Sequence, residues 1–276
     1  MADLLLVILL VPLVASAVLV AVTFLLAWWV FPGGGSRGPH DTLASRTVGV
    51  ILVVIAEWLA SAWVLVCMPF WRRRPGISRR RLPEGRNPVA LLPGFLENPT
   101  TMWLLAWRLE RGLGVPVRCL VPGNYFAGID SQAHDYVKQL ENFAQQTGAK
   151  QVDLVGHSLG GLMARYMVES GLVPGKVGSV ITVAAPHLGS ALARLVPGRS
   201  MRQMRRGSAF LEEQNAKQAP QGIRVVGLSS THDNLVIPWN CALSPRGDNF
   251  IIRYRGHVTM ILSTEVARII ARELRA

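Results

Sequence analysis

The hydrophobic positions along the chain divide it into two parts. Residues Leu4–Phe31 carry no charge, and a second apolar run follows at Thr47–Trp71. A helix needs about 20 apolar residues to cross the hydrocarbon core of a bilayer. We therefore expect residues 1–71 to form a membrane anchor with two transmembrane helices, 4–31 and 47–71. Glu57 interrupts the second run, and either a functional role or a carboxyl that faces the first helix would explain it.

A cleaved signal peptide is the alternative interpretation of the first run. Such a peptide has a basic N-terminal region and a shorter apolar core. This N-terminus instead carries Asp3, with no Lys or Arg before the apolar run. Trp28 and Trp29 end the run, where aromatic rings favour the membrane interface. The pattern therefore favours a helix that is retained.

Arginine residues cluster directly after the second run, in a linker that we place at residues 72–87. The loop between the two runs holds only Arg37 and Arg46. The positive-inside rule assigns the more basic side to the cytoplasm, so we expect the part of the chain after the linker to be cytoplasmic. The cluster consists of Arg72, Arg73, Arg74, Arg79, Arg80 and Arg81.

Beyond the linker, short apolar runs alternate with amphipathic segments. This alternation indicates an α/β domain, residues 88–276, with a mostly parallel sheet flanked by helices. Helices are expected at 100–113, 130–147, 159–169 and 258–275. Strands are expected at 88–92, 117–121, 151–155, 177–183, 223–228 and 250–254.

The composition is strongly basic. The net charge is +12, which suits an anionic membrane surface, and a solubilising surface is the alternative. No nucleic-acid-binding motif accompanies the charge, so no nucleic-acid partner is expected. Cys67, Cys119 and Cys241 lack metal-ligand spacing, and neither a metal nor a cofactor is expected. Free thiols are favoured, and a Cys119–Cys241 disulfide remains open.

The candidate chemistry begins at a glycine-rich turn. An apolar strand leads into Gly156-His157-Ser158-Leu159-Gly160-Gly161, and a helix follows. This strand–turn–helix context is typical of a serine nucleophile held in a strained turn. Glycines two residues before and after the serine leave space for it, and the helix N-terminus favours developing negative charge. Ser158 is the expected nucleophile, and a glycine–serine loop without chemistry is the alternative.

A serine nucleophile needs a base, and the base needs an acid. His257 follows the last expected strand, at an edge where catalytic side chains gather in α/β sheets. Asp233 follows the preceding strand, so the order is Ser…Asp…His. Asp248 is the rival acid, but it precedes the last strand. The remaining histidines are weaker candidates: His40, His134, His157, His187 and His232.

The oxyanion of a tetrahedral intermediate needs two N–H donors. One is expected from Leu159, directly after the nucleophile. The other is expected from the loop after the first strand, where Gly94 allows a turn. Phe95 is the first choice there and Leu96 the second.

At this point the chain resembles the bacterial lipase and esterase branch of the α/β-hydrolase family, over residues 88–276. The resemblance rests on the serine turn followed by Ala164-Arg165-Tyr166, on Ala185-Pro186-His187-Leu188-Gly189-Ser190, on Asp233 with Leu235-Val236, and on Gly256-His257. It implies an α/β-hydrolase fold with Ser158, Asp233 and His257 as triad, and with Phe95 and Leu159 as oxyanion donors. The bacterial resemblance also implies that the predicted anchor lies in a bacterial inner membrane. Many members have His-Gly before the oxyanion residue, whereas this chain has Pro93-Gly94, so a side-chain contact that orders the loop is lost.

These features predict a membrane-anchored serine hydrolase that cleaves carboxylic esters, with a lipid or acyl ester as substrate. An acyltransferase with the same triad, or a membrane-tethered scaffold without activity, are the alternatives. The stretch at about 188–221, rich in Arg and apolar residues, predicts a small cap over an acyl pocket or a plain surface helix. The oligomeric state does not follow from the sequence.

Overall fold

A computed structural model describes residues 2–30, 43–70, 80–121, 123–218 and 221–276. The predicted membrane orientation depends on the arginines on the two sides of the second apolar run. Most of these arginines lie outside the described residues: Arg37, Arg72, Arg73, Arg74 and Arg79.

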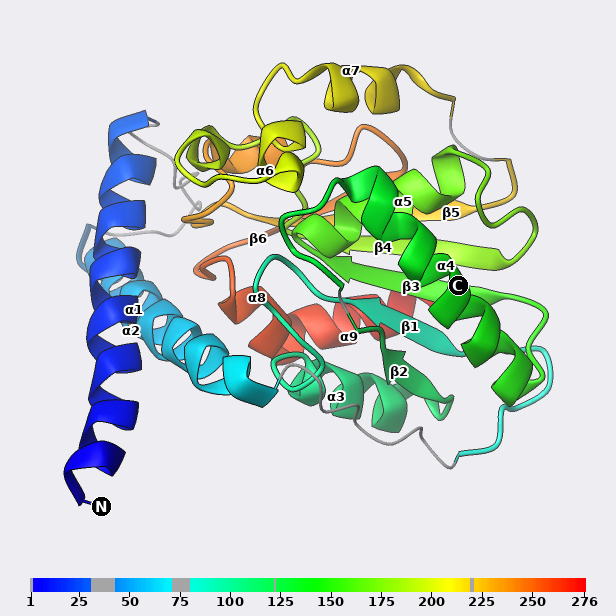
Figure 1. Ribbon diagram of the computed structural model, residues 1–276, viewed down its shortest axis with the longest axis horizontal. Helices are drawn as coiled ribbons and strands as arrows, with labels where there is room; N and C mark the ends of the chain where they lie inside the picture. Colours follow the sequence, from blue (N-terminus) through cyan, green and yellow to red (C-terminus); the bar gives the residue numbers. More distant parts are fainter. Residues whose placement is uncertain (1, 31–42, 71–79, 122, 219–220) are drawn as a thin grey trace.

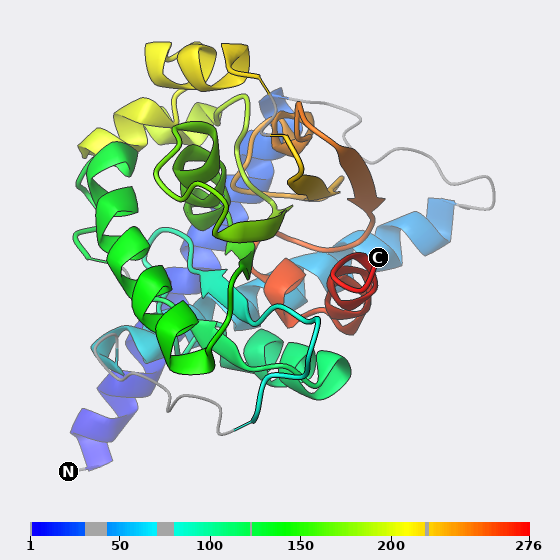
Figure 2. The same ribbon diagram turned by 90° about the vertical axis from the view of Figure 1, so that its right-hand side faces the viewer.

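Two long apolar helices precede the α/β domain, α1 (Ala2–Val30) and α2 (Leu43–Cys67). A short 3-10 turn, η1 (Met68–Phe70), follows α2. Both helices are long and apolar enough to cross a bilayer, a property that α1 shares with signal sequences and α2 with core helices. They pack side by side on one flank of the domain, which α2 contacts (Figures 1 and 2). We call them the helix pair.

Among the described residues, six strands form one sheet in the order β2-β1-β3-β4-β5-β6, and every neighbouring pair is parallel. This confirms the predicted α/β class with a parallel sheet. The central strands β1, β3 and β4 are short and mostly buried, as expected when both faces of a sheet are covered. Their bounds are β1 (Val89–Leu92), β2 (Val117–Cys119), β3 (Val152–His157), β4 (Val177–Val183), β5 (Arg224–Ser230) and β6 (Asp248–Ile252).

Helices cover both faces of the sheet (Figures 1 and 2). Side chains alternate along β1, so Val89 and Leu91 join one buried cluster and Ala90 and Leu92 join the other. The first cluster includes α3 (Trp103–Leu113) and α9 (Thr264–Glu273). The second includes α4 (Ile129–Thr147) and α5 (Leu159–Glu169).

The structure departs from the sequence pattern at the C-terminus. The single helix expected at 258–275 is split into α8 (Thr259–Leu262) and α9. Ser263 causes the break, because its extended backbone (φ −76°, ψ 129°) and its side chain, which accepts from the Val266 N–H at 3.3 Å, start a new helix. The open question of a disulfide is also answered, because Cys119 and Cys241 are free thiols.

The cap region folds into short elements over the domain. Met201 and Met204 enter the same buried cluster as α4 and α5, so this segment is packed core as well as surface. An ion pair between Arg199 and Asp130 (2.8 Å) ties it to the start of α4. The elements are η2 (Ala191–Arg194), α6 (Arg199–Gln203) and α7 (Ala209–Ala216); η3 (Trp239–Ala242) follows β5.

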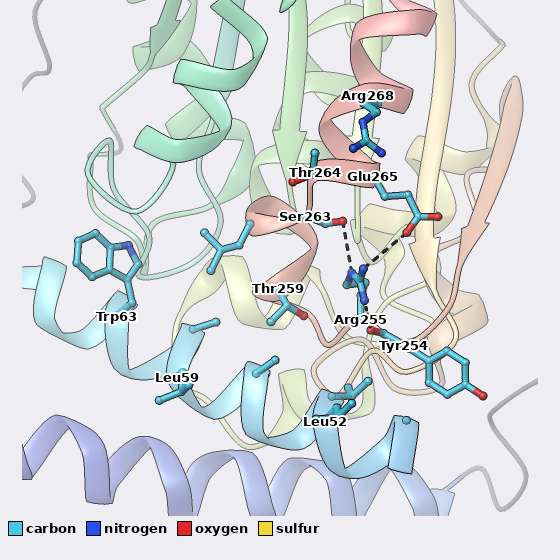
Figure 3. Close-up of a pocket in the computed structure, with 15 residues that line it drawn as sticks. Leu52, Leu59, Trp63, Tyr254, Arg255, Thr259, Ser263, Thr264, Glu265 and Arg268 are labelled. Carbon is cyan, nitrogen blue, oxygen red and sulfur yellow. Dashed lines mark hydrogen bonds and ion pairs between the residues drawn. The ribbon is translucent and has the colours of Figure 1, made fainter. Parts of the chain in front are cut away.

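A cavity of about 1180 Å³ lies between α2 and the C-terminal helices. Figure 3 shows Leu52, Leu59 and Trp63 of α2 on one side, with Arg255 and Arg268 of the α/β domain opposite them. The helix pair therefore meets the domain along a groove with one apolar and one charged wall.

Candidate active site

The candidate site lies where the strand order reverses. The chain runs from β1 outward to β2 and then returns to β3 on the other side of β1. The carboxyl ends of β1 and β3 are level, because Leu92 is paired with Gly156. Ligands of open α/β sheets bind in the crevice at such a switch point. The segment after β3 carries Ser158, and the segment after β1 carries Phe95.

Ser158 has a strained backbone, with φ 51° and ψ −122°. Non-glycine residues rarely adopt such angles, and they persist only where the surroundings enforce them. Here the Ser158 N–H donates to the Val183 carbonyl at 2.8 Å. A Cβ added at Gly156 would overlap the Gly160 carbonyl, and one added at Gly160 would overlap the Leu92 carbonyl. The two glycines are therefore required by close backbone contacts around the serine.

The loop after β1 approaches this turn closely. A Cβ at Gly94 would lie 3.0 Å from the Ser158 Cβ. The Gly94 N–H is already used, because it donates to Glu97 Oε2 at 2.7 Å, which leaves Phe95 as the next donor in the loop. Leu159 is the first residue of α5, and the first N–H groups of a helix have no partner within it. Both candidate oxyanion donors thus flank the serine turn.

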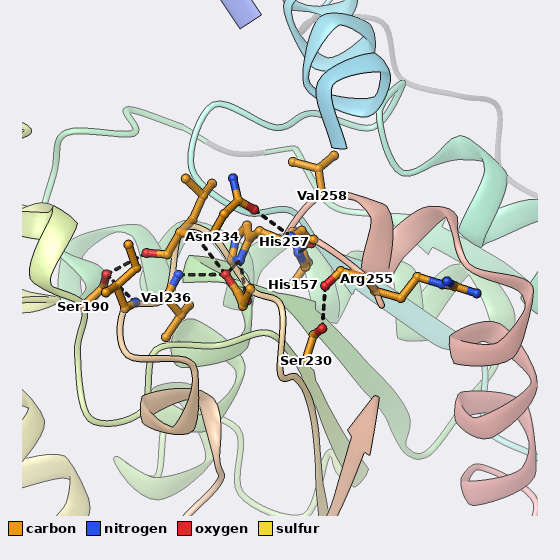
Figure 4. Close-up of polar contacts among 12 residues, drawn as sticks. His157, Ser190, Ser230, Asn234, Val236, Arg255, His257 and Val258 are labelled. Carbon is orange, nitrogen blue, oxygen red and sulfur yellow. Dashed lines mark hydrogen bonds and ion pairs between the residues drawn. The ribbon is translucent and has the colours of Figure 1, made fainter. Parts of the chain in front are cut away.

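The structure brings Asp233 and His257 together, and both side chains are buried. His257 Nδ1 lies 2.9 Å from Asp233 Oδ2 and 3.0 Å from Oδ1. Asp233 Oδ1 also accepts the N–H groups of Leu235 (2.9 Å) and Val236 (2.8 Å). Figure 4 shows His257 beside Asn234, whose Oδ1 accepts the His257 N–H at 3.1 Å. Both the candidate acid and the candidate base are therefore held by several hydrogen bonds.

The charges around His257 raise the pKa of its imidazole above the ordinary value. Burial by itself would lower this pKa, because it disfavours the cation. Asp233 outweighs burial through its charge and its hydrogen bond, and Glu57 and Glu97 add to the effect. A buried histidine with this environment is suited to accept a proton in a reaction.

Glu97 and His157 form a second buried pair that the sequence did not indicate. His157 Nδ1 lies 2.9 Å from Glu97 Oε2, and His157 Nε2 donates to the His257 carbonyl at 3.1 Å. Burial would raise the pKa of Glu97, but His157, the Gly94 N–H and His257 hold it below its usual value. Glu97 thereby supplies the loop-ordering contact that Pro93-Gly94 was expected to lack. The acidic residue four positions after Pro93 was the available signal.

His157 also connects the serine turn to the base. Its ring packs against that of His257, with 4.7 Å between the ring centroids. Because His157 precedes Ser158 directly, this contact keeps Ser158 and His257 at the same edge of the sheet.

Three rival candidates have other partners, and His40 lies outside the described residues. His187 is buried, with Nδ1 2.8 Å from Arg165 Nη1 and Nε2 3.0 Å from Thr182 Oγ1. Burial and the Arg165 charge hold the pKa of His187 well below its usual value. Asp248 is at the start of β6, at the opposite edge of the sheet, and its side chain is 73% exposed. His232 contacts Thr231 (2.8 Å) and stacks on Tyr254.

Aromatic side chains line the neighbourhood of the β1 loop. The Phe95 ring meets Tyr125 and Phe126 edge to face, with centroids 6.0 and 5.4 Å apart. Phe126 is 46% exposed, and a Cβ at Gly198 of the cap would lie 3.0 Å from its ring. The candidate oxyanion loop therefore borders an apolar surface next to the segment that was predicted to form a cap.

Comparisons with known proteins agree with the fold. The family profile described as alpha/beta hydrolase fold matches residues 87–237. A triacylglycerol lipase of Vibrio cholerae is 39% identical over 157 residues, which cover 54% of this chain and 46% of that protein. A triacylglycerol lipase of Pseudomonas fragi is 39% identical over 75 residues, 25% of each chain. The chain thus spans a quarter to about half of the length of these relatives.

The solved structure of the mature Bacillus licheniformis lipase BlEst2 is similar in fold. The TM-score is 0.62 at 14% sequence identity, and the match covers 72% of this chain and 96% of that one. At this identity the likeness concerns the fold alone. The profile match, which includes the strand, turn and helix around Ser158, shows that this chain belongs to the alpha/beta hydrolase fold family.

Proposed function

We propose that this protein is a membrane-anchored serine hydrolase that cleaves carboxylic esters of the lipid or acyl-ester class. The observation that carries the proposal is the buried Asp233–His257 pair, which lies at the same sheet edge as the strained Ser158 turn. The triacylglycerol lipases among its relatives support an ester substrate.

The reaction proceeds in two halves. The Ser158 Oγ attacks the ester carbonyl carbon while His257 accepts the hydroxyl proton. The tetrahedral intermediate collapses, the C–O bond to the alcohol breaks, and His257 returns the proton to the departing oxygen. Water then attacks the acyl-serine, again losing a proton to His257. Release of the carboxylic acid restores the Ser158 hydroxyl with the proton from His257.

Asp233 and the two backbone donors have distinct roles. Asp233 keeps the His257 Nδ1 protonated, so that Nε2 is free to act as the base. The N–H groups of Phe95 and Leu159 stabilise the oxyanion, and one such donor is worth about 10²–10³-fold in kcat. No metal or cofactor is required by these steps.

An apolar acyl group suits the surroundings of the site. Phe95 and Phe126 offer an aromatic surface next to the oxyanion loop. The apolar helix pair packs against the same domain. This position supports the proposal that the substrate enters the site from a membrane. The helix pair serves as the anchor, and the arginine-rich linker places the hydrolase domain on the cytoplasmic side.

Labelling with a fluorophosphonate tests the nucleophile. The full-length protein in detergent is expected to react, whereas Ser158→Ala is not. Ser131→Ala, which removes an exposed hydroxyl of α4, is the matched control and is expected to react like the wild type. Hydrolysis of p-nitrophenyl esters of increasing chain length then defines the acyl preference. Undiminished labelling of Ser158→Ala would refute the assignment.

A further inference from the structure

Three loops of the candidate active site each make a buried polar contact with the helix pair. Thr23 of α1 accepts from the Asn234 side chain at 2.8 Å, directly beside Asp233. Glu57 of α2 accepts from the segment after His257. The Cys67 carbonyl, at the end of α2, accepts from the Asn98 side chain at 3.0 Å, in the loop that contains Phe95. An anchor that served attachment alone would not need these contacts.

Glu57 has the most specific of these contacts. Its side chain is fully buried, and its two oxygens accept the N–H groups of Val258 (2.7 Å) and Thr259 (2.9 Å). In Figure 4, Val258 lies next to α2. A Cβ at Gly256 would overlap Glu57 Oε2, so the glycine before the histidine makes room for this carboxyl. Of the two explanations that the sequence left open for Glu57, the one in which its carboxyl faces the first helix is therefore wrong.

The backbone on both sides of His257 is therefore hydrogen-bonded to side chains that belong to the helix pair or contact it. Its own N–H donates to Asn234 Oδ1 at 3.1 Å, while Asn234 Nδ2 donates to Thr23. The next two N–H groups donate to Glu57. A histidine that acts as a base must be held within a fraction of an ångström of its productive position. These contacts determine the position of the backbone that carries the ring.

We propose that Glu57 is a positioning residue for His257, and that the helix pair holds the base in place through Glu57 and through the Thr23–Asn234 contact. This inference rests on the proposed function, because it assigns His257 the role of base. The apolar helices are then part of the framework of the active site, and displacement of α2 lowers turnover.

The titratable groups that face His257 are Asp233, Glu57, Glu97 and His157. Loss of the Glu57 carboxylate removes one of the charges that stabilise the imidazolium. The pKa of His257 then falls, and the acidic limb of the kcat/KM profile moves to lower pH. A carboxyl that served only to stabilise the fold would leave this limb in place.

The test uses the full-length protein in detergent, with rates expressed per serine titrated by a fluorophosphonate. Glu57→Gln keeps the size of the side chain but faces a backbone N–H with an amide donor. We expect kcat to fall by up to about 10²-fold, with KM little changed and the acidic limb at lower pH. Glu141→Gln makes the same change at an exposed carboxyl of α4 and is expected to match the wild type.

Thr23→Val removes the hydroxyl that accepts from Asn234 and keeps the side-chain volume. It is expected to lower kcat in the same way but by a smaller factor, and it decides the matter if Glu57→Gln does not fold. A folded Glu57→Gln variant with wild-type kcat and pH profile would overturn the positioning role. If Glu57→Gln does not fold, a wild-type kcat in Thr23→Val would overturn it instead. A wild-type protein that neither labels nor hydrolyses esters would instead overturn the proposed function.

Discussion

Asp233 makes four close contacts with only two carboxylate oxygens. Both oxygens lie within 3.0 Å of His257 Nδ1, and Oδ1 also accepts two backbone N–H groups. These hydrogen bonds fix the Asp233 carboxylate against the His257 ring. In the proposed reaction, Asp233 stabilises the imidazolium that forms when His257 accepts a proton.

Replacement of Asp233 by Asn tests this role. The amide cannot stabilise the imidazolium, and it favours the wrong tautomer of His257. We expect kcat to fall by roughly 10⁴-fold, the size seen for such a change in serine proteases. Asp248→Asn is the matched control, because Asp248 is exposed and lies at the opposite end of the sheet. Equal ester hydrolysis by the two variants would contradict the assignment of Asp233.

The pH dependence follows from the raised pKa of His257. The base acts when neutral, so kcat/KM should increase as pH rises through this pKa. We expect the midpoint of that limb above the ordinary value of about 6.5. By linkage, the same shift stabilises the fold below about pH 6.5, and this stabilisation is lost as pH rises through the folded-state pKa. A limb centred at or below 6.5 would show that Asp233 does not control the base.

At the scale of elements, β3, the serine turn and α5 form one unit with β1. Within this unit the backbones approach each other so closely that no side chain fits between them. Gly160 against the Leu92 carbonyl is an example. Because β1 is paired with β3 along its whole length, neither backbone can move away without breaking the sheet.

Two glycine-to-alanine changes separate this steric requirement from helix propensity. Gly160→Ala is expected to lower the free energy of unfolding by about 1–3 kcal/mol, the usual cost of overpacking. It is also expected to abolish fluorophosphonate labelling. Gly112→Ala in α3 meets nothing nearer than the Ala271 Cβ at 4.0 Å. It is expected to be neutral or to stabilise by about 0.5–1 kcal/mol. Urea unfolding of both full-length variants measures the difference, and a stable, reactive Gly160→Ala would refute the argument.

At the scale of the whole molecule, the hydrolase domain contacts α2 over much of its length. The contacts run from Gly49, against the Tyr254 ring, to the Cys67 carbonyl. At 1.5 Å per residue they extend over about 27 Å, nearly the thickness of the hydrocarbon core. An α2 that crosses the bilayer while docked therefore brings the edge of the hydrolase domain that carries His257 to the depth of the lipid.

Cross-linking in intact membranes tests whether the helix pair is docked there. In a background without the three native cysteines, Thr23→Cys and Asn234→Cys are expected to be joined by a short bismaleimide, because the native side chains are 2.8 Å apart. Val14→Cys with Asn234→Cys is the control pair, since Val14 is 61% exposed elsewhere on α1. No cross-link in the first pair would mean that the domain leaves the helices in the membrane.

Several features could be predicted from the sequence because they are local. The strand, the glycines, the serine and the helix around Ser158 occupy about ten consecutive positions, and the steric rules of a tight turn dictate their order. Alternating apolar runs predicted a parallel sheet, and parallel strands bring their carboxyl ends to one edge. For that reason Asp233 and His257 could be named as candidates before their distance was known.

Other features depend on partners far apart in the chain. Glu97 and His157 are 60 positions apart, and Glu57 and Val258 are 201 positions apart. Periodicity tells which face of an element is buried, but it does not tell what that face meets. A lone carboxyl in an apolar helix therefore looked the same whether it faced α1 or the base. Only the packing of the helix pair on the α/β domain decided that Glu57 lies against the loop of His257.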